Sequence, residues 1–132
     1  MLMVNGFKYA KILVVEDEKY MRDLYIKLLQ EEGYEVDWAA DGVSAYEKII
    51  PGKYDLVLLD LMLPKMDGIS IIKKLLEKYK SINNLPKIVV LTNLGTDKIM
   101  MEAITLGVRG YILKSEVTPD KILLELKNYL NQ

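Results

Sequence analysis

The 132-residue chain contains neither cysteine nor histidine. Without cysteine, the protein can form no disulfide and has no thiolate to act as a nucleophile or metal ligand. The lack of histidine excludes Ser-His and Cys-His catalytic pairs, imidazole-bound metals and a phosphohistidine carried on this chain.

The chain also lacks an excess of charge and a long apolar segment. Its 18 basic and 19 acidic residues give a formal net charge of −1, so we expect no direct DNA binding. No apolar run exceeds about five residues, against the ~20 needed to span a bilayer, so we expect no membrane association. The opening MLMV is followed by Asn5 and Gly6 and is too short for a signal-peptide core. The expected location is therefore the cytoplasm.

The chain does have enough apolar material, 51% of its residues, for one hydrophobic core. Its length fits one domain at the usual ~100–200 residues per domain. We expect residues 1–10 to form an N-terminal tail and residues 11–132 to form a single domain.

The apolar pattern alternates between two kinds of segment. Short continuous runs, typical of strands buried on both faces of a parallel sheet, occur at Ile12–Val15, Leu56–Leu59 and Ile88–Leu91, with shorter runs near Val36 and at Tyr111–Leu113. Between them, residues 21–29, 42–50, 69–79, 97–106 and 118–130 show helical spacing, with cap or stop residues at Gly33, Asp41, Pro51, Gly107 and Thr118.

This alternation predicts five βα units and hence an α/β fold, a doubly wound parallel sheet with helices on both faces. Ligands of such sheets bind beyond the carboxyl ends of the strands. The residues that follow each strand are therefore the candidates for a functional site.

Acidic residues follow two of the predicted strands. Glu16, Asp17 and Glu18 come after the first strand, and Asp60 comes after the third. If these strands are neighbours, Glu16, Asp17 and Asp60 converge and repel one another unless a cation is present. Oxygen ligands without histidine or cysteine suit Mg²⁺.

The fourth and fifth strands end in complementary chemistry, a hydroxyl at Thr92 and an ammonium at Lys114. With the carboxylates and a metal, they would form a phosphoryl-binding pocket in which Asp60, exposed at its strand tip, is the nucleophile. Each residue also has a simpler interpretation, as a helix cap, a turn residue or a solvated lysine. These weaken jointly because four of five strand ends carry matching chemistry.

The segments ILVVEDE, YDLVLLDLMLPKMDG, VVLTN and GYILKS resemble, in order and spacing, the motifs of bacterial response-regulator receiver domains. The resemblance covers residues 11–130 and implies the flavodoxin-like (βα)5 fold with strand order 2-1-3-4-5. It implies Asp60 as phosphoacceptor and Asp17 as a direct Mg²⁺ ligand. Glu16 would hold the metal mostly through water, and the main-chain carbonyl of Met62 would be a further ligand.

The resemblance also implies that Lys114 and Thr92 bind phosphoryl oxygens and that Tyr111 is a rotameric switch. The phosphoryl group would come from a phosphohistidine of a histidine kinase or histidine phosphotransfer protein. The domain would take part in its own phosphorylation and slow dephosphorylation without being an enzyme. We expect no effector domain, a downstream protein target, and a monomer or weak dimer through the face of the fourth helix, fifth strand and fifth helix.

Three departures from the family pattern bear on these expectations. Ser115 follows the lysine where proline is usual, so the loop lacks an isomeric lock. Asn93 follows the threonine where a small residue is common, which predicts tighter access to the phosphoryl group. Met62 and Leu94 are apolar and offer nothing to orient a hydrolytic water, which predicts a long-lived acyl phosphate.

Other functions remain open at this point. A phosphatase with an aspartyl-phosphate intermediate would need a second acid two residues after its nucleophile, where this chain has Met62. A flavin or nucleotide carrier would need a phosphate-binding loop after the first strand, where VVEDEKY is acidic. A pseudo-receiver that binds partners without phosphorylation is the third alternative.

Overall fold

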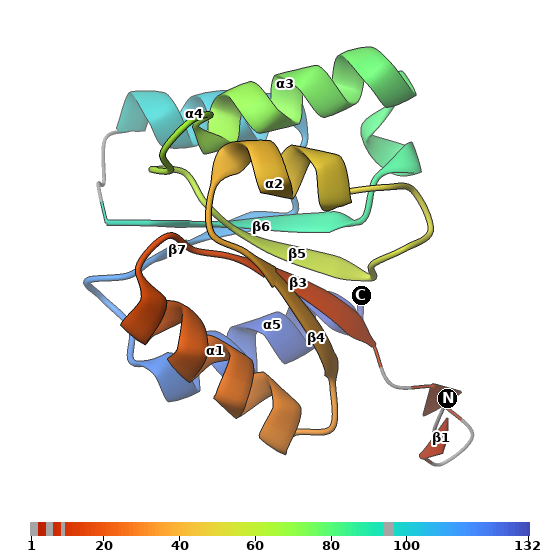
Figure 1. Cartoon of the computed structure of the whole chain (residues 1–132), viewed down its shortest axis with the longest axis vertical. Coiled ribbons are helices and arrows are strands. Elements are labelled where there is room, and N and C mark those ends of the chain that lie inside the picture. The colour runs from red at the N-terminus through yellow and green to blue at the C-terminus, as the bar shows by residue number, and fades with distance from the viewer. Residues whose placement is uncertain (1–2, 5–6, 9, 94–96) are drawn as a thin grey trace.

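The computed structural model describes residues 3–4, 7–8, 10–93 and 97–132. Its centre is a parallel five-stranded sheet (Figure 1). In spatial order the strands are β4 (Glu35–Ala39), β3 (Lys11–Val15), β5 (Leu56–Asp60), β6 (Lys87–Thr92) and β7 (Gly110–Leu113). Numbered along the chain, this is the order 2-1-3-4-5, which confirms the prediction.

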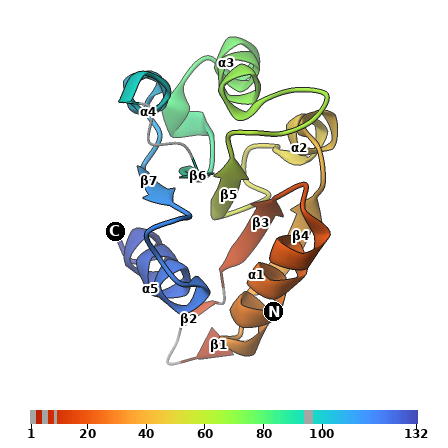
Figure 2. The same cartoon turned by 90° about the vertical axis from the view of Figure 1, so that its left-hand side faces the viewer.

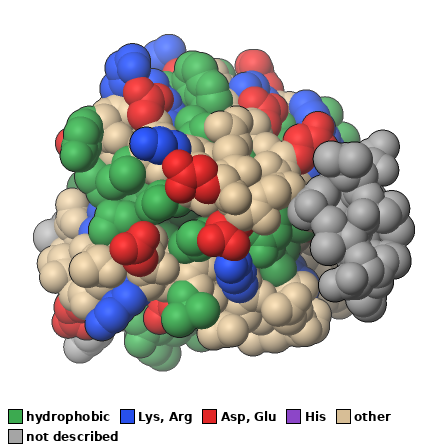
Figure 3. All heavy atoms as spheres, turned by 90° about the horizontal axis from the view of Figure 1, so that it is seen from below, with side chains coloured by type: hydrophobic (Ala, Val, Ile, Leu, Met, Phe, Trp, Pro, Cys, Tyr) green, Lys and Arg blue, Asp and Glu red, His purple; other side chains and the backbone are tan. Residues whose placement is uncertain are grey.

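Helices cover both faces of the sheet (Figures 1 and 2). Helices α1 (Lys19–Glu31) and α5 (Pro119–Leu130) pack on one face. Helices α2 (Gly42–Lys48), α3 (Gly68–Tyr79) and α4 (Asp97–Leu106) lie on the other, with a short 3₁₀ turn at Ile82–Asn84 before β6. On the surface seen in Figure 3, acidic, basic and apolar side chains are interspersed.

The three central strands are almost completely buried, as their continuous apolar runs predict. Successive side chains point to opposite faces of a strand. In β5, Leu56 and Leu58 therefore join the core under α1 and α5, while Val57 and Leu59 join the core under α2 to α4. The sheet thus separates two apolar layers.

The helix boundaries follow local capping chemistry. The side chains of Asp41, Asp67 and Thr118 accept hydrogen bonds from backbone N–H groups in the first turns of α2, α3 and α5. Gly107 ends α4 with φ of 101°, a left-handed conformation in which glycine has no Cβ penalty. Helix α2 ends at Lys48 rather than at the expected Ile50, because the chain leaves helical geometry at the fully buried Ile49.

The expected tail contains two very short strands. Strands β1 (Met3–Val4) and β2 (Phe7–Lys8) pair antiparallel, and no sequence pattern predicted them. Among the helices of the described residues, none is both long enough and apolar enough to cross a membrane.

Candidate functional site

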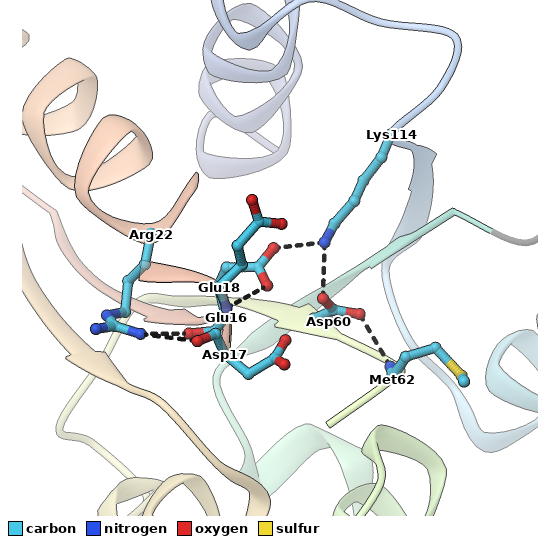
Figure 4. Close-up of polar contacts among 7 residues, drawn as sticks. All are labelled: Glu16, Asp17, Glu18, Arg22, Asp60, Met62 and Lys114. Carbon is cyan, nitrogen blue, oxygen red and sulfur yellow. Dashed lines mark hydrogen bonds and ion pairs between the residues drawn. The ribbon is translucent and has the colours of Figure 1, made fainter. Parts of the chain in front are cut away.

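Asp60 is the last residue of β5 and is only 4% exposed. The expectation that it is exposed at its strand tip is therefore wrong. Its Oδ1 accepts a hydrogen bond from the backbone N–H of Met62 (2.9 Å), and its Oδ2 accepts one from Lys114 Nζ (2.7 Å; Figure 4). Burial of the carboxylate is tolerated because both oxygens have donors.

Glu16 and Asp17 follow β3, the neighbour of β5. Because Val15 pairs with Leu59, Glu16 lies beside Asp60 at the carboxyl edge of the sheet. One ligand oxygen from each of Glu16, Asp17 and Asp60 lies within 4.8 Å of the others. The predicted convergence of the three carboxylates is thus confirmed.

The two acids after β3 differ in their surroundings. Glu16 is 1% exposed; its Oε2 accepts a hydrogen bond from the backbone N–H of Glu18 (3.2 Å) and its Oε1 is bound by Lys114. Asp17 is exposed to the pocket. Asp17 is therefore the freer ligand, while Glu16 has donors on both oxygens already.

Lys114 stands in the turn after β7, and its backbone N–H donates to the carbonyl of Thr92 (2.8 Å). From this anchor its side chain reaches past β6 and binds both Asp60 and Glu16 (Figure 4). Burial opposes the ammonium charge, but the hydrogen bonds to Asp60 and Glu16 outweigh it and place the pKa of Lys114 above its ordinary value. The lysine thus stays charged and partly neutralises two buried acids.

Strand alternation places the predicted switch residues, Thr92 and Tyr111, on the sheet face that α2 to α4 cover. Tyr111 pairs with Val90 and Leu113 pairs with Thr92, so Tyr111 and Thr92 share the face of Val90, which belongs to the core under α2 to α4. Thr92 is buried and Tyr111 is 42% exposed. The structure places the two residues on neighbouring strands, beside the site but not in its lining.

The acids open into a pocket of about 380 Å³. Its lining residues are Glu16, Asp17, Glu18, Asp60, Met62, Asn93 and Lys114. Asn93 lines the pocket, where it is predicted to narrow access to the phosphoryl group, and Met62 is 55% exposed there. Leu94 lies outside the described residues. Ser115 lies in the turn after β7, and no cis peptide bond occurs in the described ranges.

The donor set fits a hard divalent cation. Three carboxylates, two of them almost fully buried, face one open pocket, and like charges at this spacing favour a bound cation. Asp17 and Asp60 can bind Mg²⁺ directly, and Glu16 can bind it through water, since Mg²⁺ usually retains several waters. The position of the Met62 carbonyl toward such an ion stays a prediction.

The sequence did not single out Arg22, a polar residue of α1 that the structure buries, whereas Tyr25 belongs to the predicted apolar stripe of this helix. Arg22, Tyr25 and Leu29 share a face and are the buried residues of this helix. Their spacing of i, i+3 and i+7 was a usable signal, because an arginine on the inward face of an amphipathic helix needs a polar partner. Burial raises the pKa of Tyr25 to about 12; the charge of Lys114 opposes this shift and nearby carboxylates reinforce it.

A family model described as the response regulator receiver domain matches residues 12–127. The chain belongs to the response regulator receiver family. It is 40% identical over 114 residues to the chemotaxis protein CheY of Treponema pallidum, covering 83% of this chain and 75% of that one. It is 38% identical over 104 residues to the transcriptional regulatory protein CusR of Escherichia coli, covering 79% of this chain and 44% of that one. The chain thus spans less than half of the length of that transcriptional regulator.

Solved structures of receiver proteins superpose on this domain. The CheY-like receiver domain protein of Methanospirillum hungatei gives a TM-score of 0.82 at 27% identity, with 94% of this chain and 95% of that chain covered. Chemotaxis protein CheY4 of Vibrio cholerae gives 0.80 at 28% identity, with 92% and 99% covered. The flavodoxin-like fold that the resemblance implied is therefore correct.

Proposed function

We propose that this receiver domain accepts a phosphoryl group on Asp60 from a phosphohistidine of a histidine kinase or histidine phosphotransfer protein. A carboxylate oxygen of Asp60 attacks phosphorus, the O–P bond forms and the P–N bond breaks. The bonding electrons leave with the imidazole nitrogen, and the product is an aspartyl phosphate. The domain is a phosphoacceptor, not an enzyme that turns over a substrate.

The observation that carries this proposal is the position of Asp60. Its carboxylate lies at the pocket with Lys114 Nζ 2.7 Å from Oδ2 and with the Glu16 and Asp17 carboxylates close by. A purely structural aspartate would be neutralised by the lysine alone. Here Glu16 is a second buried acid on the same lysine and Asp17 adds a third negative charge beside them, so the cluster is unfavourable unless the pocket holds a cation.

We assign Mg²⁺ to this pocket, bound by Asp17 and Asp60, by Glu16 through water and by the Met62 carbonyl. The ion supplies charge that offsets the negative oxygens of the transferred group. We expect the ammonium of Lys114, which binds Asp60 and Glu16, to bind a phosphoryl oxygen in addition. The backbone N–H of Met62 holds the Asp60 carboxylate in place.

We further propose that phosphorylation draws the Thr92 hydroxyl toward the phosphoryl group and that the Tyr111 ring follows inward. The shared sheet face of Thr92 and Tyr111 supports this coupling. The Tyr111 side chain is partly exposed in this structure, so an inward movement would bury it further. We propose that the movement of the ring shifts the equilibrium between two conformations of the face formed by α4, β7 and α5.

The output surface that we propose is formed by α4, β7 and α5. Exposed apolar side chains occur on each of these elements, namely Met101, Ile104, Tyr111 and Leu124. We expect this surface to bind a downstream protein, or to form a weak dimer, without direct contact to DNA. The expected phosphodonors are cytoplasmic, so we place the reaction in the cytoplasm.

The test is incubation of the whole chain with Mg²⁺ and a small phosphodonor such as phosphoramidate, followed by intact mass measurement. The wild-type chain gains one phosphoryl group and Asp60→Asn gains none. Asp67→Asn is the matched control because asparagine also caps helices well, so α3 and the phosphorylation are preserved. A wild type that remains unmodified, or an Asp60→Asn chain that is modified equally, would contradict the proposal.

A further inference from the structure

Arg22 is a buried cation whose purpose the phosphorylation chemistry does not explain. It lies in the first turn of α1 and is only 7% exposed. Among the described residues, no carboxylate forms an ion pair with it, and its Nε has no hydrogen-bond partner. A buried charge without a counter-ion is unfavourable for folding, so an interaction elsewhere must offset its cost.

The guanidinium of Arg22 instead binds the backbone of the acidic loop. Its Nη1 donates to the main-chain carbonyl of Glu16 (3.0 Å) and to that of Asp17 (3.3 Å; Figure 4). The N–H of Glu16 donates in turn to the carbonyl of Ala39 at the end of β4 (3.1 Å). The peptide units that carry the two acids are therefore held from both sides.

Trp38 holds the arginine in place. This residue of β4 pairs with Val14 of β3, and its ring centroid lies 4.5 Å from Arg22 Cζ, within the range of a cation–π contact. Lys48 lies 5.6 Å from the same centroid, and its Nζ donates to the Trp38 carbonyl (2.6 Å). Although Trp38 is 46% exposed, its indole is thus fixed beside the guanidinium.

We propose that Arg22, held by Trp38, is a positioning residue that presets the Glu16–Asp17 loop for the divalent cation. Its two hydrogen bonds fix the backbone from which both carboxylates project toward Asp60. Its positive charge also lowers the repulsion among the three acids before the cation arrives. This inference rests on the proposed magnesium-dependent function.

The experiment is a Mg²⁺ titration of the whole chain, in which backbone amide chemical shifts measured by NMR give the Kd for the cation. Mutation of residues that hydrogen-bond to and orient metal ligands typically lowers metal affinity about 10–100-fold, so we expect about a 10-fold larger Kd for Arg22→Met. Arg22→Lys, which keeps the charge and one donor group, should recover part of the affinity. Arg109→Met is the matched control, because the chain's other arginine is exposed just before β7, at the opposite edge of the sheet.

A second measurement separates positioning from general stabilisation. Trp38 is the only tryptophan of the chain, so its fluorescence reports on the Arg22 contact. In the wild type, saturating Mg²⁺ should change the Trp38 emission, and Arg22→Met should lose this response even with the cation bound. Destabilising the fold elsewhere would not remove it. If Arg22→Met does not fold, Trp38→Leu tests the same contact, with a smaller expected rise in Kd.

The outcomes are distinct. A wild type that binds no Mg²⁺ would overturn the proposed metal site, and this inference with it. A wild type that binds Mg²⁺ together with an Arg22→Met, or Trp38→Leu, Kd within twofold of it would overturn the inference alone. A weaker Kd in these variants with an unchanged Arg109→Met supports it.

Discussion

The two ends of the central sheet use the same charged residue types in opposite ways. At the amino end, Lys11 Nζ lies 3.9 Å from Glu35 Oε1, with the side chains 31% and 58% exposed. At the carboxyl end, Lys114 binds Asp60 and Glu16, whose side chains are 12%, 5% and 1% exposed. The chemistry of the pairs is alike, and their burial differs.

This difference decides what each pair does. An exposed ion pair is screened by water and contributes about 0–1 kcal/mol. A buried cluster cannot lose one member without leaving the others uncompensated. Substitution of a charged residue should therefore cost little stability at the amino end. At the carboxyl end the excess negative charge is offset only when a cation binds.

The largest test of this comparison removes the lysine from each end. Lys114→Met leaves two buried acids without their cation, and we expect it to lower the free energy of unfolding by about 3–5 kcal/mol at neutral pH without Mg²⁺. Lys11→Met should lower it by less than about 1 kcal/mol. Urea unfolding of both variants measures the contrast. Equal losses would mean that burial does not separate the two ends.

Mg²⁺ should act on the carboxyl end alone. We expect the cation to raise the free energy of unfolding by about 1–3 kcal/mol at concentrations ten to a hundred times Kd, by mass action on the folded state. Asp17→Asn should lose most of this gain, whereas Asp55→Asn, at the amino end of β5, should keep it. The measurement is thermal unfolding at matched ionic strength. An equal gain in Asp17→Asn would contradict the assignment of the metal to the acidic pocket.

Alkaline pH gives a third, smaller contrast through Tyr25, which is buried beneath the carboxyl end. Its folded pKa of about 12 exceeds the ordinary value of 10.0, so the unfolded chain ionises first as the pH rises. The free energy of unfolding therefore loses nothing from this group below pH 10 and falls between pH 10 and 12, and the loss reaches about 1 kcal/mol by pH 11.

Tyr25→Phe should remove this part of the pH dependence. The variant should not be destabilised at pH 7, since it also removes a buried hydroxyl that has no hydrogen-bond partner within the described part of the chain. Tyr20→Phe, at a 74% exposed position of the same helix, is the control. Urea unfolding between pH 8 and pH 11 compares the three chains, and parallel curves for wild type and Tyr25→Phe would refute the expectation. The pH limits here bracket the ordinary tyrosine pKa of about 10.

The smallest expected effect concerns Met62, which lines the acidic pocket, and the lifetime of the aspartyl phosphate. Met62→Asn supplies a polar side chain that can orient water, so we expect the aspartyl phosphate to decay a few-fold faster, about 1 kcal/mol in activation free energy. Phosphoryl loss followed by intact mass checks this. Met101→Asn, which changes an exposed methionine on α4, should leave the lifetime unchanged. A Met62→Asn phosphate that persists as long as the wild type would show that the apolar residue is not what protects it.

Much of this site could be predicted because its residues follow buried strands. The runs before Glu16, Asp60 and Lys114 identify three strand ends, and the carboxyl ends of parallel strands share one edge. The exposure of Asp60 was wrongly predicted, because burial depends on what covers a strand end. The hydrogen bonds from Arg22 to the backbone of Glu16 and Asp17 were not predicted, because Arg22 appears in the sequence as one more charge on an amphipathic helix.

By itself, the sequence determined the α/β alternation, the helix caps and the kinds of side chain at each strand end, because these depend on neighbours along the chain. Only the tertiary structure decided which of these side chains meet. Lys114 binds partners 98 and 54 positions away, and such contacts depend on strand order and register. Register also decided that Trp38 lies beside the helix that carries Arg22, a packing relation that no local pattern encodes.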